Sequence, residues 1–361
     1  MTDAELKASC HSHLPGHRQP APAELFAAMS AWCGQHGITH DVYGSGALIQ
    51  DFERKIANLL GFEAAVFCIT GTMTQATALR LACMERGSRL VALHPTSHIL
   101  KHERGNHQLF DHFQALQVGD PHRPWTLDEL KAQPDKLAAA ALELPAREIG
   151  GQCPSWDELA AIKAYCREQS IHLHLDGARL WETAAAYGRS AGEIASGFDT
   201  VYVSMYKGIG GMAGAMLLGS AALVAKASEW FKRQGGNVYQ RTPYVVAAAM
   251  QFDARLAEMP AYFQRTLWLY EVLREFPLLV PNPAAPQANM LHLHLPVSRE
   301  RALEIRHQIA ERHGVWLFNN ANHAMLPNRS YAEIYIGDNL LTLPDERVRE
   351  ILALWSEALT N

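Results

Sequence analysis

Short apolar runs alternate with helical segments along residues 65–218, and this alternation constrains the fold more than any other feature. The runs have the length and apolar character of buried strands, and they span residues 65–69, 89–93, 138–142, 171–175, 200–205 and 213–218. Strands that are apolar on both faces and separated by helices are typical of a mainly parallel sheet covered on both sides. The sequence therefore predicts a large α/β domain built around such a sheet.

Helical patterns and breakers divide the chain into three parts. Residues 47–60 carry one apolar face and are followed by Gly61, the residue type that commonly ends a helix. Ser155 and Glu158 have the spacing of a capping box for a helix over 155–169. After prolines that follow residue 274, strand-like and helical patterns alternate at 290–295, 299–313, 331–336 and 344–359. We expect an irregular arm over 1–22, a large domain over 23–250 and a small α+β domain over 251–361.

Composition and charge exclude several classes of function. The formal net charge is -5 and no dense Lys/Arg stripe is present, which argues against nucleic-acid binding. We find no apolar stretch long enough to span a membrane and no apolar core of a signal peptide, so we expect no membrane association and a cytoplasmic location. None of the six cysteines is spaced as C-x-x-C, and the histidines follow no metal-binding pattern, so we expect reduced thiols and no metal.

The segment Thr70-Gly71-Thr72-Met73 lies between a predicted strand and a predicted helix. Gly71 allows the backbone to approach an anion closely, and the N–H groups and dipole of the following helix favour a phosphate there. The hydroxyl of Thr72 is a further donor. Taken alone, a glycine at a strand–helix turn also has a purely geometric explanation.

Two further segments end predicted strands with a charged residue. Asp176 closes the run His172-Leu173-His174-Leu175, at the edge where open α/β sheets place ligands. Lys207 follows the strand that ends near Met205, and flexible glycines come after it. An apolar setting shifts a lysine toward the neutral amine, the form that attacks an aldehyde. Considered separately, Asp176 could cap a helix and Lys207 could extend from a loop into solvent.

Together these three segments supply what pyridoxal 5'-phosphate (PLP) requires. The cofactor needs an amine for a Schiff base, a carboxylate that keeps its pyridine nitrogen protonated, and a helix N-terminus for its phosphate. Lys207, Asp176 and Gly71–Thr72 provide them in that order. The sequence therefore predicts a PLP enzyme that acts on a small amino acid.

The chain resembles the threonine aldolase and aromatic amino acid β-eliminating lyase family of fold-type I PLP enzymes over residues 41–249, more than half of its length. The motifs that carry the resemblance are Asp41-Val42-Tyr43-Gly44, Thr70-Gly71-Thr72-Met73, Ser97-His98 followed by Glu103, His174-Leu175-Asp176-Gly177-Ala178-Arg179 and Lys207-Gly208. The resemblance implies an aspartate-aminotransferase-like large domain. It also implies a homodimer or homotetramer whose active sites lie at a subunit interface reached by Tyr43.

The same resemblance implies a role for each candidate residue. Lys207 would hold PLP, Asp176 would contact the pyridine nitrogen, and His98 would stack on the ring. Gly71, Thr72 and Arg241 would bind the phosphate, and Arg179 would lie near the substrate carboxylate or the ring oxygen.

The substrate half of the site departs from the family pattern. The segment after residues 142–145 reads Ala146-Arg147-Glu148, where related enzymes carry a histidine tied to aldol chemistry. Glu333 stands where a second carboxylate-binding arginine is expected. Three explanations remain open: Arg179 acts alone, a histidine such as His13 from the cluster His11, His13 and His17 replaces the arginine, or Glu333 pairs with a basic group on the substrate.

We therefore expect retro-aldol cleavage of a β-hydroxy-α-amino acid to glycine and an aldehyde. The cofactor allows β-elimination or transamination on the same scaffold, and the sequence does not choose among the three reactions. A protein that binds PLP without catalysis is a further alternative, which the retention of Lys207 and Asp176 disfavours.

Overall fold

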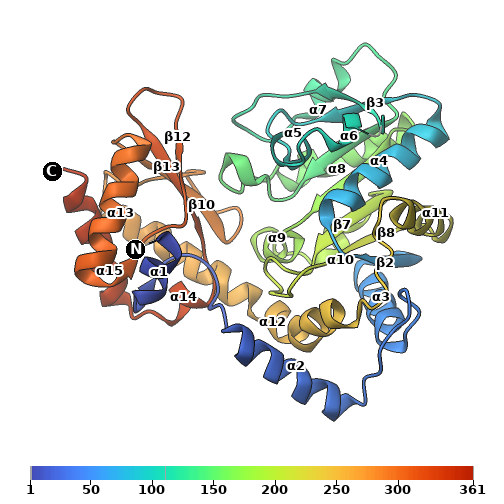
Figure 1. Cartoon of the computed structure of the whole chain (residues 1–361). Coiled ribbons are helices and arrows are strands. Elements are labelled where there is room, and N and C mark those ends of the chain that lie inside the picture. Colours follow the sequence, from blue (N-terminus) through green and yellow to red (C-terminus); the bar gives the residue numbers. More distant parts are fainter. Residues whose placement is uncertain (1, 110, 361) are drawn as a thin grey trace. The chain divides into compact units, whose positions relative to one another are not determined.

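The computed structural model describes residues 2–109 and 111–360 of the chain, which fold into two compact units. The larger unit comprises residues 20–148 and 152–257, and the C-terminal unit comprises residues 258–361, the segment 149–151 and the N-terminal residues up to Gln19 (Figure 1). The helix α12 (Thr242–Leu273) begins in the larger unit and ends in the C-terminal one.

A mixed, mostly parallel sheet forms the centre of the larger unit. In the described part of the chain it has the order β2-β8-β7-β6-β5-β3-β4. The strands are β2 (Ala64–Cys68), β3 (Leu90–Leu93), β4 (Gln114–Gln117), β5 (Ala139–Glu143), β6 (His172–Gly177), β7 (Thr200–Ser204) and β8 (Ala215–Gly219). β8 runs antiparallel to both of its neighbours, and the remaining strands are parallel to one another. The predicted α/β class and mainly parallel sheet are confirmed, whereas β4 was not among the predicted strands.

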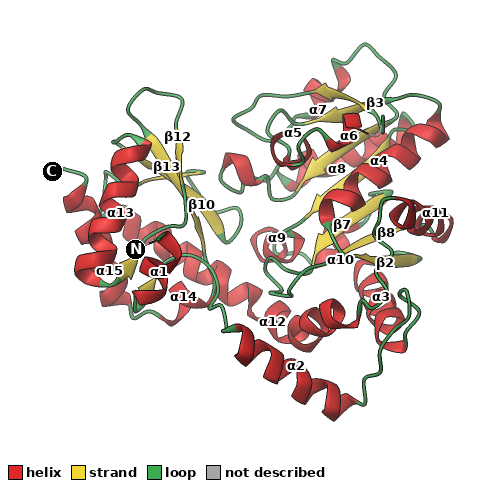
Figure 2. Ribbon diagram, in the orientation of Figure 1, coloured by secondary structure: helices red, strands yellow, loops and turns green. Residues whose placement is uncertain are grey.

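The larger unit also contains helices, most of which pack on the sheet or on one another (Figure 2). They are α2 (Pro22–His36), α3 (Ala47–Leu60), α4 (Gly71–Arg86), α5 (His98–His102), α6 (Asn106–Leu109), α7 (Leu127–Lys131), the 3-10 turn η1 (Arg147–Ile149), α8 (Trp156–Glu168), α9 (Leu180–Tyr187), α10 (Ala191–Ala195) and α11 (Ala221–Arg233). The small side chains of Ala76, Ala78 and Ala82 on α4 are fully buried. They let α4 lie close against the sheet, and this closeness fixes where the N-terminus of α4 stands.

The ends of two predicted helices show how local sequence sets the boundaries. α3 ends at Leu60, as predicted from Gly61, and Gly61 adopts the left-handed conformation that is common after the last residue of a helix. Ser155 caps α8 by accepting a hydrogen bond from the Glu158 N–H at 3.1 Å. The side chain of Glu158 does not return the bond to the cap, because its carboxylate accepts from the Leu127 N–H instead. The capping box is therefore only half formed.

The C-terminal unit contains a four-stranded antiparallel sheet of order β12-β13-β10-β9 and a parallel pair, β1 with β11. Its elements are α1 (Asp3–Ser9), β1 (Ser12–His13), β9 (Val280–Asn282), β10 (Met290–Leu295), α13 (Arg299–His313), β11 (Val315–Trp316), β12 (Ala321–His323), β13 (Ser330–Tyr335), α14 (Asp338–Thr342) and α15 (Asp345–Ala358). This is the expected α+β composition. Among the described residues, no helix is both long and apolar enough to cross a membrane.

The N-terminal residues differ from the irregular arm expected over 1–22. They form α1, whose first turn has a capping box between Thr2 and Glu5, and then the strand β1. Leu6 and Cys10 pack against Ala310 and Trp316 of the C-terminal unit. The prolines and glycine at positions 15–22 interrupt the chain only after these elements, so the prediction was wrong for the residues before them. The structure also divides the chain at residue 258, where we expected 251.

Candidate active site

The carboxyl ends of five strands bring the candidate residues to one edge of the larger sheet. β2, β7, β6, β5 and β3 are parallel, so their carboxyl ends share that edge. Thr70–Gly71 follow β2, His98 follows β3, Glu143 ends β5, Asp176 lies near the end of β6, and Lys207 follows β7. Open α/β sheets bind ligands at this edge. The three segments that the sequence analysis singled out therefore converge.

Lys207 stands on a turn held by the last residue of β7. The hydroxyl of Ser204 accepts hydrogen bonds from the backbone N–H groups of Tyr206 and Lys207, both at 3.3 Å. Burial lowers the pKa of Lys207 to about 8, with a further lowering by the nearby charge of Arg179 that Asp176 opposes. Lys207 therefore reaches the neutral, nucleophilic amine more readily near neutral pH than an exposed lysine does.

Asp176 is a buried carboxylate beside this lysine, with 5% of its surface exposed. Its Oδ1 accepts a hydrogen bond from the Ala178 N–H at 3.2 Å. It does not cap α9, since the capping residue of that helix is Arg179. The alternative explanation of Asp176 as a helix cap is therefore wrong, and a buried carboxylate at this edge calls for a cationic partner.

Two histidines precede Asp176 on β6 and point to the same side of the sheet. The ring atoms His172 Nε2 and His174 Nδ1 each lie 2.8 Å from the hydroxyl of Thr200 on β7. Burial lowers the pKa of His174 to about 3, so this ring stays neutral. The two rings connect β6 to β7, and burial favours their neutral forms, so they add no positive charge near Asp176.

His98 is oriented by a chain of hydrogen bonds that begins on α4. Gln75 donates to Glu103 Oε1 at 3.3 Å, and the same oxygen lies 3.2 Å from His98 Nδ1. Burial alone would lower the pKa of His98, but the hydrogen bond to Glu103 and the charge of Asp176 outweigh it, and the pKa is raised. The side chain of Glu103 is fully buried, which makes His98 its natural cationic partner.

The N-terminus of α4 and Arg241 form a cradle suited to an anion. Thr70 caps the helix by accepting from the Met73 N–H at 3.4 Å. Arg241 donates to the carbonyl of Phe67 at 3.3 Å, next to that turn, and is itself buried. Its Nε is buried with no hydrogen-bond partner among the described residues. A buried donor without a partner is costly, so an anion bound here would satisfy it.

Asp41 ties Arg241 to the loop that carries Tyr43. Its Oδ1 accepts the backbone N–H groups of Arg241 and Thr242 at 2.7 Å, and its Oδ2 accepts the Gly44 N–H at 2.8 Å. Burial raises the pKa of Asp41, but these hydrogen bonds outweigh it and hold the pKa below its usual value. Tyr43 itself has a positive φ of 52°, and 52% of its surface is exposed.

Sequence reasoning missed Glu143, the last residue of β5, which pairs in register with Asp176. Its Oε2 accepts a hydrogen bond from the backbone N–H of His98 at 3.3 Å, and its Oε1 accepts one from the backbone N–H of Arg147 at 3.1 Å. Burial, with the neighbouring charge of Asp176, raises the pKa of Glu143 to about 7. An acidic residue that closes an otherwise apolar run at this edge was the available signal.

The two substrate candidates outside the larger unit are Glu333 and His13. Glu333 lies on β13 and pairs in register with His292 of β10. His13 lies on β1 with its Nε2 3.1 Å from the Cys10 carbonyl, and burial lowers its pKa. All of the cofactor candidates, by contrast, belong to the larger unit.

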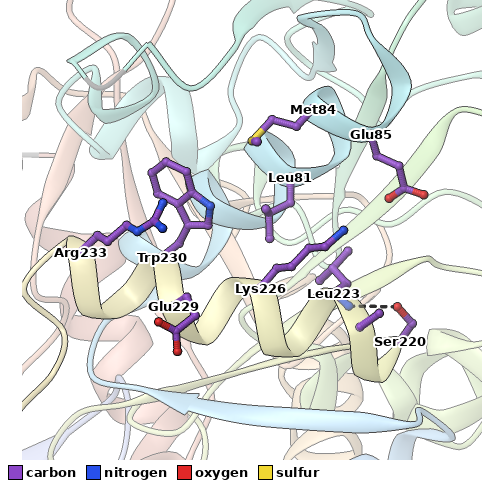
Figure 3. Close-up of a pocket in the computed structure, with 10 residues that line it drawn as sticks. Leu81, Met84, Glu85, Ser220, Leu223, Lys226, Glu229, Trp230 and Arg233 are labelled. Atoms are coloured by element: carbon purple, nitrogen blue, oxygen red, sulfur yellow. Dashed lines mark hydrogen bonds between the residues drawn. The ribbon is translucent and has the colours of Figure 1, made fainter.

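The larger unit also has a surface cavity that contains none of these residues. It has a volume of about 620 Å³ and lies between α4 and α11 (Figure 3). Its walls include Leu81, Met84, Lys226 and Trp230. We therefore locate the candidate site by the converging charged groups and not by the size of the hollow.

Comparison with known proteins identifies the family. The family model described as β-eliminating lyase matches residues 19–296. The chain belongs to the β-eliminating lyase family. Membership confirms the predicted fold class, the lyase class and the dependence on PLP.

Relatives of this β-eliminating lyase cover most of its length. A low specificity L-threonine aldolase of Escherichia coli (strain K12) is 28% identical over 262 residues, which are 71% of this chain and 77% of the relative. A Listeria monocytogenes structure, provisionally assigned as an L-allo-threonine aldolase, is 35% identical with a TM-score of 0.92 and covers 98% of this chain and 99% of its own. A structure from Exiguobacterium sp. 255-15, named for the aromatic amino acid β-eliminating lyase/threonine aldolase group, is 36% identical with a TM-score of 0.91 over the same shares.

The residues at the sheet edge fit PLP. Lys207 offers a partly neutral amine, Asp176 is a buried carboxylate, and Arg241 has a buried donor beside the N-terminus of α4. These are the groups that an aldehyde, a pyridinium nitrogen and a phosphate each require.

Gly71 gives a test of the cradle. A Cβ at this position would lie 2.3 Å from the Tyr202 hydroxyl oxygen, so Gly71→Ala forces the first turn of α4 away from β7. We expect the dissociation constant for PLP to rise at least about tenfold, since displaced N–H groups bind the phosphate poorly. Absorbance titration of the apoprotein with PLP measures it.

Gly34→Ala is the matched control for this substitution. Gly34 lies on α2, and a Cβ there would meet no heavy atom within 4 Å. This variant should bind PLP as the unmodified protein does. A Gly71→Ala protein with unchanged PLP affinity would show that the turn does not hold the phosphate.

Proposed function

We propose that this lyase cleaves β-hydroxy-α-amino acids by a retro-aldol reaction and releases glycine and an aldehyde. The observation that carries the proposal is the cofactor edge itself, with a partly neutral Lys207 beside the buried carboxylate of Asp176. The names of the relatives, which are threonine aldolases, support this reaction over others on the same scaffold.

Each residue at the edge has a part in holding the cofactor. Lys207 would bind it covalently, and Asp176 would keep a proton on the pyridine nitrogen through a charge-assisted hydrogen bond. The N-terminus of α4 with Gly71 and Thr72 would bind the phosphate together with Arg241. His98 would support the ring, and Arg179 would bind the substrate carboxylate. When bound, PLP supplies an electron sink that stabilises negative charge on the α-carbon of the substrate.

Two groups at the edge can move the protons that the reaction needs. Cleavage takes one proton from the β-hydroxyl as the bond between the α- and β-carbons breaks, and the glycine α-carbon then gains one proton. The pKa of Glu143 is about 7 and that of Lys207 about 8, both close to the value that suits a general base or acid near neutral pH. We assign the hydroxyl proton to Glu143 because the segment Ala146-Arg147-Glu148 has no histidine where related enzymes carry one.

β-Elimination and transamination are the competing reactions, and a panel of amino acids separates them. We expect threonine and related β-hydroxy amino acids to release glycine and an aldehyde. Pyruvate with ammonia would indicate elimination, and exchange with a keto acid would indicate transamination; either outcome as the main activity would contradict the proposal.

The same panel run on Asp176→Asn tests the role of the buried carboxylate. An amide cannot hold a positive charge on the pyridine nitrogen, so we expect the variant to retain some PLP and lose most of its turnover. Cofactor content from the absorbance spectrum is the control for binding. Turnover within about twofold of the unmodified enzyme, under roughly 0.5 kcal/mol of transition-state stabilisation, would refute the role.

A homo-oligomer with Tyr43 at the subunit interface completes the proposal. Val42, Tyr43 and Tyr239 expose 49%, 52% and 57% of their surfaces, and the two tyrosine rings meet edge to face at 5.3 Å. Clustered exposed apolar side chains of this kind mark interaction sites. Sedimentation at micromolar concentration should show a dimer or a tetramer, whereas an active monomer would exclude this assignment.

We further propose that Glu333 selects substrates that carry a basic group, with His13 as a second candidate on the same unit. Tyr331, Glu333 and Tyr335 alternate along β13 and so share one face, and the stacking of Tyr331 on His292 at 4.5 Å lines that face with rings. A carboxylate among aromatic rings suits a cation.

Substitution of Glu333 tests this selectivity. Glu333→Gln should lower kcat/KM at least about threefold for a β-hydroxy amino acid with a terminal amine and leave threonine within about twofold, because only the first loses an ion pair. Glu311→Gln, on the exposed side of α13, is the control. If neither substrate responds to Glu333→Gln, the residue lies outside the substrate pocket.

A further inference from the structure

Binding an amino acid at this edge raises a problem of charge. Asp176, Glu143 and Glu103 already bring three carboxyl groups to it, and burial raises the pKa values of Glu143 and Glu103. The carboxylate of a substrate adds another negative charge in a poorly solvated place. One arginine, Arg179, is expected to face it, and the position expected to supply a second arginine is Glu333.

Arg147 is a second arginine that the fold itself brings to the edge. It comes four residues after Glu143, and its backbone N–H donates to Glu143 Oε1 at 3.1 Å. The segment is closed by the Ala146 N–H, which donates to the Gln152 carbonyl at 2.9 Å. The start of this turn is therefore anchored to the strand that lies next to Asp176 in the sheet.

The charges of Arg147 and Arg179 both act on Lys207. The positive charges of both arginines lower the pKa of Lys207, and that of Arg179 is the larger effect. The guanidinium of Arg147 is about one third exposed, at 32%, and its Nη1 lies 3.3 Å from Glu148 Oε1. The backbone of Arg147 thus lies at the edge, next to Glu143, and its guanidinium is open to a ligand that enters from solvent.

We propose that Arg147 binds the carboxylate of the amino-acid substrate, beside Arg179, and so supplies from the larger unit the second cation that Glu333 does not. This rests on the proposed function only in taking an amino acid as the substrate. A guanidinium binds a carboxylate through two parallel hydrogen bonds, which fixes the orientation of the ligand as well as its affinity.

A purely structural role is the competing explanation for Arg147. The ion pair with Glu148 could hold the turn, and the same Glu148 oxygen lies 2.9 Å from His102 Nε2. Partly exposed pairs of this kind contribute about 0–1 kcal/mol. The substitution Glu148→Gln removes the pair and leaves the guanidinium in place, so it separates the two explanations.

The experiment compares two ligands that differ by one carboxylate. Alanine and ethylamine both have an amine that reacts with the cofactor, and neither can undergo aldol cleavage or β-elimination. Each is titrated into the holoenzyme, and the change in cofactor absorbance gives the dissociation constant. The readout does not depend on turnover of either ligand, so it stands even if β-elimination and not aldol cleavage proves to be the main reaction.

We expect Arg147→Ala to weaken alanine binding by about tenfold to a hundredfold, the loss of a hydrogen bond to a charged group, and to leave ethylamine within about twofold. Arg147→Lys should recover part of the affinity for alanine, because a lysine keeps the charge but not the paired donors. Glu148→Gln should match the unmodified enzyme for both ligands. The unligated absorbance spectrum of each variant checks that the cofactor is bound.

Two results would overturn the proposal. An equal loss for alanine and ethylamine in Arg147→Ala would place Arg147 in the support of the cofactor or the turn. Unchanged alanine binding in that variant would place its side chain away from the carboxylate. If Arg147→Ala does not fold, Arg147→Lys decides the matter, since a loss selective for alanine is still required of it.

Discussion

Burial of charged groups at one edge of the larger sheet is the constraint on which the rest of this site depends. Burial lowers the pKa of Lys207 to about 8 and raises that of Glu143 to about 7. Each shift makes the group reactive near neutral pH, and each costs folding free energy unless an opposite charge lies near. The edge meets this condition because it contains charges of both signs: the positive charges of Arg179 and Arg147 and the negative charges of Asp176 and Glu143 all act on Lys207. Binding PLP adds further partners, so the site is better satisfied with the cofactor than without it.

The surrounding structure holds these charges in place through short hydrogen-bond chains. Asp41 fixes Arg241 and the Tyr43 loop together, and Gln75 on α4 reaches His98 through Glu103. The second chain starts on α4, which lies close to the sheet because Ala76, Ala78 and Ala82 are among its buried residues. Positioning at the active edge therefore depends on core packing as much as on the catalytic side chains, since a shift of α4 would move the anion cradle and His98 at once.

Much of the large domain and of its cofactor half could be predicted from the sequence. The apolar runs predicted the strands, Gly61 predicted the end of α3, and the segments after three predicted strands singled out Gly71, Asp176 and Lys207. The edge strand β4 was missed because Gln114–Gln117 is polar at both ends and half-buried, and α1 was missed because the later prolines hid a short capped helix. The direction of β8 depends on the connection after β7, to which residue pattern gives no guide.

The substrate-binding part of the site was harder to predict, because the roles of its residues depend on which neighbours the fold gives them. Glu143 looks like a solvated acid after a strand until its register with Asp176 is known, and Arg147 looks like an ordinary loop arginine until its charge is placed near Lys207. The sequence showed that a histidine and an arginine of related enzymes are missing there. It did not show which residues replace them.

The account stands on Lys207 being the lysine that binds PLP, and covalent trapping tests this most directly. Burial also lowers the pKa of Lys163 to about 8, although its amine donates to the Ile194 carbonyl at 2.7 Å and lies near the rings of Trp156 and Phe198. A low pKa alone would thus allow either lysine, whereas the geometry of the edge selects Lys207. Borohydride reduction of the purified protein followed by peptide mapping should place the cofactor on the peptide that contains Lys207. Its recovery on Lys163, or on any other lysine, would contradict the account.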